Sequence, residues 1–486
     1  MKKRLFTICG IGLLSALFCA FASEVEDGII YEYENGAWWV IGAEQGVTDI
    51  VIPQYLWGDP SDKVGGIKQF AFWKSHIETV EVNVPQIQAY AFMSSHDLKK
   101  VTIGTNVKHI DPGAFLDCIN LETLNISNGL IDIGDASFAS TALQEIIIPK
   151  SVTSIGLAPF ADCSKLVSIS VDPSNSVFDS REDCNAIITT SINTLHTGCN
   201  STIIPNSVIA IASNAFHMSG LTSINIPNSV IKIGQKAFQS CKSLEDVYIG
   251  ESVKTIEAAA FQGCTALNVL YFNAISCDDF VGEIDNPFTN AYGTESLNHS
   301  IIFGEKVQRI PAFFAINNTN IRKLTIPNSV KTIGKKAFSG CIQLNDVTLG
   351  RSVNEIMECA FEGCPYINVT SMNPEPPDCE GMQIFHRNVY RTTSETNDPN
   401  VLYVPKGCEF RYRQKHDAWC WTIIREKDFS AIFSDVNGDG EVNIADVNTV
   451  IDCILKGNQI STSDVNCDGE VNISDINAVI GCILRQ

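Results

Sequence analysis

The sequence predicts a solenoid of short parallel β-strands with irregular or short helical returns, followed by a small all-α domain that holds two metal-binding loops. A repeated phrase predicts the solenoid: residues 221–244 read LTSINIPNSVIKIGQKAFQSCKSL, and close copies occupy 244–267 and 321–344. A unit of this size cannot bury its apolar face alone, so neighbouring copies must stack around one continuous core. A duplicated run of alternating acidic and amide residues near the C-terminus predicts the second domain.

The first residues have the pattern of an export signal. Residues 2–4 are basic, 5–18 are apolar but too short to span a bilayer, and 20–22 read AFA, which is a typical cleavage site. The bulky residue before Cys19 argues against the alternative of lipid attachment there. We therefore expect a signal peptide at 1–22 and a secreted or cell-surface protein, with no transmembrane segment.

The composition is that of a folded, acidic chain. Of the 486 residues, 45% are hydrophobic and 18% are charged, and the formal net charge is −21. Such a negative surface argues against nucleic acid and anionic membranes as partners, and it favours cation binding.

Each coil can be divided into a strand, a turn and a return. Residues 221–226 alternate apolar and polar side chains, as a half-buried strand does, and Pro227 ends the strand. Gly234 supplies backbone freedom for the next bend, and a dipeptide of the Ala-Phe type begins the return. These marker dipeptides are Ala71-Phe72, Ala91-Phe92, Ala114-Phe115, Ser137-Phe138, Pro159-Phe160, Ala215-Phe216, Ala237-Phe238, Ala260-Phe261, Phe313-Phe314, Ala337-Phe338 and Ala360-Phe361.

Both ends of such a stack need a cap, and two wide gaps between markers indicate elongated coils. The predicted divisions are an N-terminal cap at 23–66, repeats at 67–365 with elongated coils near 172–200 and 275–303, a C-terminal cap at 366–430 and the metal-binding domain at 431–486.

Six of the 18 cysteines lie three residues after a repeat phenylalanine, which predicts an inward row of small apolar side chains. Disulfides between neighbouring coils remain the alternative. Two pairs outside this register, Cys184 with Cys199 and Cys408 with Cys420, are the better disulfide candidates. The six repeat cysteines are Cys118, Cys163, Cys241, Cys264, Cys341 and Cys364.

The repeated phrase IPxSVxxIGxxAFxxC resembles the BspA-like, or treponemal-type, leucine-rich repeat over about 300 residues. The resemblance implies a leucine-rich-repeat solenoid, curved and right-handed, that serves protein–protein contact and adhesion on bacterial surfaces. It implies no catalysis.

Strand positions that point away from the core are the candidate binding surface. Tyr248 and Tyr271 are expected on adjacent coils, with Asp246 nearby, where they could form an aromatic platform for a peptide or a sugar. Two ordinary surface tyrosines are the alternative, since aromatic residues are common on strands. The whole outward row is Glu81, Thr102, Asn125, Ile147, Ser170, Asn225, Tyr248, Tyr271, Thr325 and Thr348.

The C-terminal segment carries two calcium-type loops 29 residues apart. Oxygen-bearing side chains at loop positions 1, 3, 5 and 12 converge on one hard cation, a glycine at position 6 makes the sharp turn, and position 7 offers its backbone carbonyl. We therefore predict two bound calcium ions. The predicted ligands are Asp435, Asn437, Asp439, Glu441 and Asp446 in the first loop, and Asp464, Asn466, Asp468, Glu470 and Asp475 in the second.

Each loop leads into a short apolar-striped helix, position 12 is Asp rather than Glu, and no helix precedes the first loop. This duplicated arrangement resembles a type I dockerin, which implies calcium-dependent folding and docking onto a cohesin domain of another protein. Loop positions 10 and 11, where dockerins often carry a Ser-Thr recognition pair, are Ile444-Ala445 and Ile473-Ser474. These are the candidate docking residues, and the departure leaves the partner open. A calcium-stabilised tail without a docking role is the alternative.

No motif for catalysis accompanies these domains, because the eight histidines are scattered singly and no nucleotide-binding or hydrolase phrase occurs. The sequence thus predicts a non-enzymatic recognition protein. Its solenoid would bind a host or bacterial surface macromolecule, and its tail a cohesin-type partner. The alternative is a component of a polysaccharide-degrading assembly, non-catalytic or, less readily, catalytic, with a polysaccharide as ligand.

Overall fold

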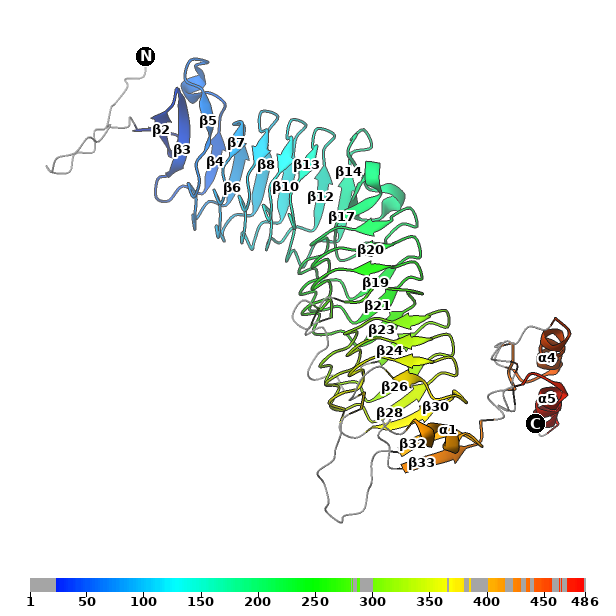
Figure 1. The fold of residues 1–486 in the computed structure, drawn as a ribbon. Coiled ribbons are helices and arrows are strands. Elements are labelled where there is room, and N and C mark those ends of the chain that lie inside the picture. The colour runs from blue at the N-terminus through cyan, green and yellow to red at the C-terminus, as the bar shows by residue number, and fades with distance from the viewer. Residues whose placement is uncertain are drawn as a thin grey trace, which may run out of the picture. The chain divides into compact units, whose positions relative to one another are not determined.

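Two compact units, each containing a run of β-solenoid coils, make up the chain in the computed structural model (Figure 1). The first unit comprises Met1–Leu267 with Ile284–Gly293, and the second comprises Asn268–Glu283 with Thr294–Gln486. The predicted solenoid is confirmed, whereas the predicted signal peptide lies outside the described residues. The structure describes residues 23–280, 282, 286–288, 300–364, 367–379, 384–385, 401–415, 423–429, 434–437, 441–456, 463, 465 and 470–484.

An antiparallel sheet begins the first unit and covers the end of its core. Tyr31 and Val40 are fully buried in it, and the indole Nε1 of Trp38 donates to the Asp62 carboxylate at 3.2 Å. The sheet consists of β1 (Ser23–Glu26), β2 (Ile29–Glu34) and β3 (Ala37–Ala43), and β3 pairs in parallel with β5 (Val64–Ile67).

From there each coil contributes one strand to each of two parallel ladders. The four-residue strands alternate buried and exposed side chains, as the repeat phrase predicts. They are β4 (Asp49–Ile52), β6 (Thr79–Val82), β8 (Lys100–Ile103), β10 (Thr123–Ile126), β12 (Glu145–Ile148), β14 (Ser168–Val171), β19 (Ser223–Ile226) and β21 (Asp246–Ile249). The two-residue strands are β7 (Gln86–Ile87), β9 (His109–Ile110), β11 (Asp132–Ile133), β13 (Ser154–Ile155), β18 (Ala210–Ile211), β20 (Lys232–Ile233) and β22 (Thr255–Ile256).

One coil of the first unit carries an antiparallel hairpin. Its last strand leaves the hairpin and pairs in parallel with β18, so the coil rejoins the solenoid. The hairpin strands are β15 (Phe178–Asp179), β16 (Ala186–Thr189) and β17 (Thr194–Gly198).

The second unit repeats the solenoid pattern and ends in helices. Its largest sheet is parallel and has five strands, in the order β26 (Lys323–Ile326), β28 (Asp346–Leu349), β30 (Asn368–Ser371), β32 (Val401–Pro405) and β33 (Ile423–Lys427). The other elements are β23 (Val269–Phe272), β24 (Ser300–Phe303), β25 (Arg309–Ile310), β27 (Thr332–Ile333), β29 (Glu355–Ile356), β31 (Asp378–Cys379), α1 (Glu409–Gln414), α4 (Ile444–Lys456) and α5 (Ile473–Ile483).

The returns of the coils are compact turns rather than helices. In the coil of Phe238, Lys236 (φ 58°) and Ser240 (φ 60°) both have left-handed backbone conformations. These left-handed residues direct the N–H groups of Lys236, Phe238 and Ser240 toward the next coil. There they donate to backbone carbonyl oxygens at 3.1, 2.7 and 2.7 Å. The turns therefore form a third hydrogen-bonded ladder between neighbouring coils.

Repeat phenylalanines stack inside this ladder. Ring centroids of Phe216, Phe238 and Phe261 follow one another at 4.8 and 4.9 Å with nearly parallel planes. The marker predicted as Phe313-Phe314 is wrong by one residue. Ala315 donates to Ala337 O as Phe238 donates to Ala260 O, so here the order is inverted to Phe314-Ala315.

The predicted inward row of cysteines is confirmed. All six are buried free thiols, and Cys241 and Cys264 donate to the carbonyls of Phe216 and Phe238 in the preceding coil at 2.9 and 3.1 Å. Burial raises the pKa of Cys118 to about 12 and that of Cys163 to about 11.

The predicted Cys184–Cys199 disulfide is wrong, since both are free thiols. Cys199 Sγ donates to Asn185 O at 3.3 Å, and Cys184 Sγ to Ala186 O at 3.7 Å. Each sulfur is thus directed at a backbone carbonyl. The proposed partner of Cys408, Cys420, lies outside the described residues.

Replacing Phe238 with alanine is expected to destabilise the protein by about 3–5 kcal/mol, because the substitution leaves a cavity between two stacked rings. Thermal or urea unfolding measures the effect. The matched control is Ile231→Ala, whose side chain is 47% exposed and should change stability by less than about 1 kcal/mol. Equal losses in the two variants would contradict a core held together by the phenylalanine column.

The repeat thiols are expected to resist iodoacetamide in the folded protein at about pH 8, because only the thiolate reacts and burial keeps the proton on sulfur. Labelling followed by peptide mass spectrometry should find Cys118 and Cys163 modified only after denaturation. Rapid labelling of either residue in the native protein would show that the column opens to solvent.

Candidate functional site

The C-terminal domain is built around two short helices that start where each predicted calcium loop ends. At α5, the Asn472 side chain accepts from Ser474 N at 2.8 Å, and the Asp475 carboxylate accepts from Asn472 N at 2.8 Å. This capping box fixes the first turn of the helix. The apolar core of the domain comprises Phe429, Val436, Val447, Val450, Val465 and Val479.

Loop position 12 is occupied by a fully buried carboxylate in both halves. Asp446 accepts from Val436 N (2.7 Å) and Asn437 N (3.0 Å) through Oδ1 and from Asn443 N (2.8 Å) through Oδ2. Asp475 likewise accepts from Val465 N at 2.7 Å. In each loop, the aspartate at position 12 therefore accepts a hydrogen bond from the backbone near position 1, which connects the end of the loop to its start.

The hydrogen bonds to Asp446 leave one of its acceptor positions unused. A carboxylate offers about four acceptor positions, and three hydrogen bonds occupy three of those of Asp446. The described members of the predicted ligand set are all oxygen donors, which suits calcium. Asp435, Asn437, Glu441, Asp446, Glu470 and Asp475 are described, whereas Asp439, Asp464, Asn466 and Asp468 lie outside the described residues.

Within the described ranges, no group of three or more His, Cys, Asp or Glu side chains is arranged to hold a metal ion. The assignment of these segments as calcium loops therefore depends on their oxygen-bearing side chains and on the buried aspartates. The ligand set stays a prediction.

The predicted docking residues lie at the starts of the two helices. Ile444 is 67% exposed and Ile473 is 70% exposed, and Ser474 is also exposed, whereas Ala445 is half-buried. Sequence reasoning missed a second pair of exposed apolar residues that occupy equivalent positions in the two halves. They are Leu455 and Leu484, at the ends of the helices. Their spacing of 29 residues, equal to that of the loops, is the signal that could have found them.

The two tyrosines of the predicted platform lie on different strands. Tyr248 lies on β21 of the first unit and is 38% exposed, whereas Tyr271 lies half-buried on β23 of the second unit. Asp246 begins β21. The platform remains a prediction.

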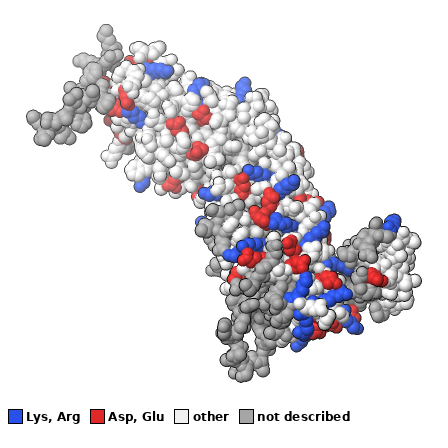
Figure 2. Space-filling view, viewed as in Figure 1, with Lys and Arg blue, Asp and Glu red and all other residues white. Residues whose placement is uncertain are grey.

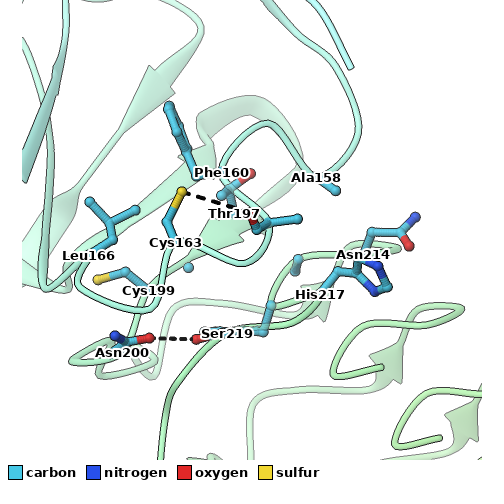
Figure 3. A pocket seen from close by; sticks show the side chains of 14 residues that line it. Ala158, Phe160, Cys163, Leu166, Thr197, Cys199, Asn200, Asn214, His217 and Ser219 are labelled. Atoms are coloured by element: carbon cyan, nitrogen blue, oxygen red, sulfur yellow. Dashed lines mark hydrogen bonds between the residues drawn. The ribbon is translucent and has the colours of Figure 1, made fainter. Parts of the chain in front are cut away.

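A pocket in the first unit marks a break in the phenylalanine column (Figure 3). Gly198 N donates to Ala215 O, so Gly198 occupies the position of a repeat phenylalanine, and a Cβ there would lie 2.1 Å from the Phe216 ring. Asn200 and Ser219, hydrogen-bonded at 2.9 Å, lie on its wall.

Two titratable side chains of this pocket, Cys163 and His217, have shifted pKa values. Cys163 lines it, but burial holds this residue as a thiol, the opposite of an activated nucleophile. Burial, and then the charge of Lys236, lower the pKa of His217 on the same wall. Both residues are therefore held in their neutral forms by burial.

Comparison with known proteins agrees with both domains. The BspA type leucine-rich repeat region matches in six copies over residues 65–185, 194–277 and 308–377, which is more than half of the chain. The type I dockerin domain matches residues 433–484. No curated protein matches the chain.

Solved structures of bacterial leucine-rich repeat proteins are similar. One from Bacteroides ovatus has a TM-score of 0.56 at 22% identity, covering 83% of this chain and 100% of that one, and it shows the shared fold. The pneumococcal vaccine antigen PcpA has 15% identity, 84% and 99% coverage and a TM-score of 0.43. A protein from Eubacterium ventriosum has 21% identity, 71% and 89% coverage and a TM-score of 0.41.

Neither of the matched domains is catalytic, and proteins that carry them are typically extracellular or surface-bound. Type I dockerin domains bind calcium and imply a cohesin-type protein partner. In the part of the chain that the structure describes, no helix is long and apolar enough to cross a membrane. The chain belongs to the BspA-type leucine-rich repeat family and carries a type I dockerin domain.

Proposed function

We propose that this is an exported, non-enzymatic bacterial protein whose calcium-loaded tail attaches it to a cohesin-type partner while its solenoid recognises and adheres to a second macromolecule. The duplicated buried aspartate, Asp446 in one loop and Asp475 in the other, carries the proposal. A carboxylate of this kind is held in place by loop amides and is available to an ion.

Two calcium ions would be held, one by each loop. The ligands we assign are Asp435, Asn437, Asp439, Glu441 and Asp446, and Asp464, Asn466, Asp468, Glu470 and Asp475. When bound, the ions supply the positive charge that holds the carboxylates and amides of each loop together. Calcium thereby orders the loops from which both helices start.

Docking is assigned to the exposed starts of the helices. Ile444 and Ile473 expose apolar surface beside Ala445 and Ser474, so the partner must offer an apolar counter-surface. This chemistry differs from recognition through hydroxyl groups. The exposed isoleucines therefore favour a cohesin-type partner that recognises apolar side chains at these positions.

Location outside the cytoplasm follows from the leader-like residues 1–22 and from the usual setting of both domain types. In that setting the solenoid would face surface macromolecules of the host or of other bacteria.

The test is a pull-down with the full mature chain as bait against secreted and surface extract, in calcium and in chelator, and again with residues 435–486 deleted. A cohesin-bearing partner captured only with calcium and only with the tail supports docking. Capture that ignores calcium and survives the deletion overturns it, and leaves the tail as a structural element.

Replacing Asp446 with alanine should reduce calcium binding from about two ions per chain to about one, because the first loop loses its position 12 ligand and the anchor for its amides. Isothermal titration of the full chain measures the stoichiometry. Glu441→Gln is the control, since position 7 binds through its backbone carbonyl and should still take up about two ions. Unchanged stoichiometry in the alanine variant would contradict the assignment.

Replacing both Ile444 and Ile473 with aspartate should abolish partner capture while calcium uptake stays normal, because the charges cannot be buried against an apolar partner. Pull-down and calcium titration are made on the same preparation. Retained capture would place the docking surface elsewhere on the tail.

A further inference from the structure

The outward face of the five-stranded sheet in the second unit carries an ordered row of hydrogen-bonding side chains. Strand register aligns one residue from each strand, because β26, β28, β30, β32 and β33 pair in parallel. The residues next to them in the strands, Leu324, Val347, Val369, Leu402 and Ile424, are buried, so the row points outward. In order the row is Thr325, Thr348, Thr370, Tyr403 and Arg425.

The row is straight and regularly spaced. Neighbouring strands of a sheet lie about 4.8 Å apart, so the five positions extend over about 19 Å. Three hydroxyl groups are followed by a half-buried phenol and an exposed guanidinium. Threonine alone would say little, because it is common on exposed strands. The residues at the β33 end of the row are more indicative of a ligand.

Two cations and two aromatic rings lie at that end. Lys427 Nζ lies 6.0 Å from the ring centroid of Tyr403 and 5.6 Å from that of Phe429. Among the described residues, neither Arg425 nor Lys427 forms a salt bridge with an acidic side chain. At the other end of the sheet, Lys323 is neutralised by Asp346 at 3.5 Å. Two positive side chains therefore lie on one face of β33, since Arg425 and Lys427 are two residues apart in the strand and Glu426 lies between them.

The charge balance of the surrounding segment also departs from that of the chain. Residues 300–429 contain 16 Lys and Arg against 14 Asp and Glu, whereas the whole chain contains 34 against 55. Figure 2 shows many Lys and Arg side chains, with Asp and Glu among them, over the part of the molecule that Figure 1 labels β26 to β33.

We propose that this face binds an acidic polysaccharide that lies along the row, with its sugar hydroxyls at Thr325, Thr348 and Thr370 and a carboxylate or sulfate group at Arg425 and Lys427. A sugar ring has apolar C–H faces and polar edges, which suit the ring of Tyr403 and the neighbouring hydroxyls. Guanidinium and ammonium groups form charge-assisted hydrogen bonds with such anions. This function goes beyond attachment through the tail and does not depend on it.

Nucleic acid is the less suitable polyanion. It carries charge continuously along its length, and a chain of net charge −21 repels such a ligand beyond the short basic segment. An acidic polysaccharide carries anionic groups among many hydroxyl groups. This pattern matches a row of threonine hydroxyl groups with two cationic side chains at one end.

The experiment measures binding of the full chain, in calcium, to carboxymethyl-dextran, dextran sulfate and neutral dextran by biolayer interferometry. We expect binding to one or both charged dextrans, weaker binding at high salt, and none to neutral dextran. The two charged forms separate carboxylate from sulfate recognition. Equal binding to neutral dextran, or tighter binding to duplex DNA than to either charged dextran, overturns the proposal.

The double variant Arg425→Gln, Lys427→Gln should bind the charged dextran about tenfold more weakly. The control variant Lys254→Gln, Lys331→Gln removes the same charge from exposed sites just before β22 and β27 and should bind within about twofold of the native protein. Equal loss in both variants means that net charge, and not this face, binds the ligand.

Tyr403→Thr removes the ring while it keeps a hydroxyl group and a strand-favouring residue in the row, and it should weaken binding several-fold with an unchanged thermal midpoint. Binding unaffected by this substitution and by the arginine–lysine pair overturns the site. Pull-down of the cohesin-type partner is scored separately, so either proposal can fail alone.

Discussion

Coil-to-coil hydrogen bonding is the constraint on which the rest of the solenoid depends. Two strand ladders and one turn ladder connect each coil to the next, and the turn ladder exists because residues such as Lys236 and Ser240 adopt left-handed conformations. Each such residue costs about 1–2 kcal/mol, which an isolated coil could not offset. The stacked phenylalanines and the cysteine thiols bonded to backbone carbonyls offset it only when neighbouring coils are present. Stability is therefore a property of the stack.

The same constraint separates structural from functional positions. Inward residues are held by the stack, so their identity repeats, as the phenylalanines show. Outward strand positions are not packed into the core, so their identity can vary at little cost in stability. The row from Thr325 to Arg425 illustrates this: the buried neighbours stay aliphatic while the outward residues change from hydroxyl to phenol to guanidinium. Parallel register then brings residues about a hundred positions apart onto one line.

The sequence was sufficient to predict the structural features that recur in every repeat. The strand alternation, the phenylalanine column and the inward cysteines all follow from one phrase. The order of Phe314 and Ala315 could not be read, because two adjacent phenylalanines fit the pattern equally and only the backbone hydrogen bonds decide between them. Tyr403 and Arg425 were missed because they lie on strands outside the repeat phrase, where spacing no longer predicts the register. The free thiols of Cys184 and Cys199 depend on side-chain direction, which spacing does not encode.

The two domains depend on different interactions, and this difference has a functional consequence. The solenoid is held by apolar stacking and by backbone hydrogen bonds, neither of which involves a metal ion. The tail has a small core, and its loops are closed by Asp446 and Asp475, whose buried charges are best compensated by a cation. We therefore expect that loss of calcium would loosen the tail while the solenoid stays folded. On the proposed function, removing calcium would release the protein from its partner without loss of what the solenoid has bound.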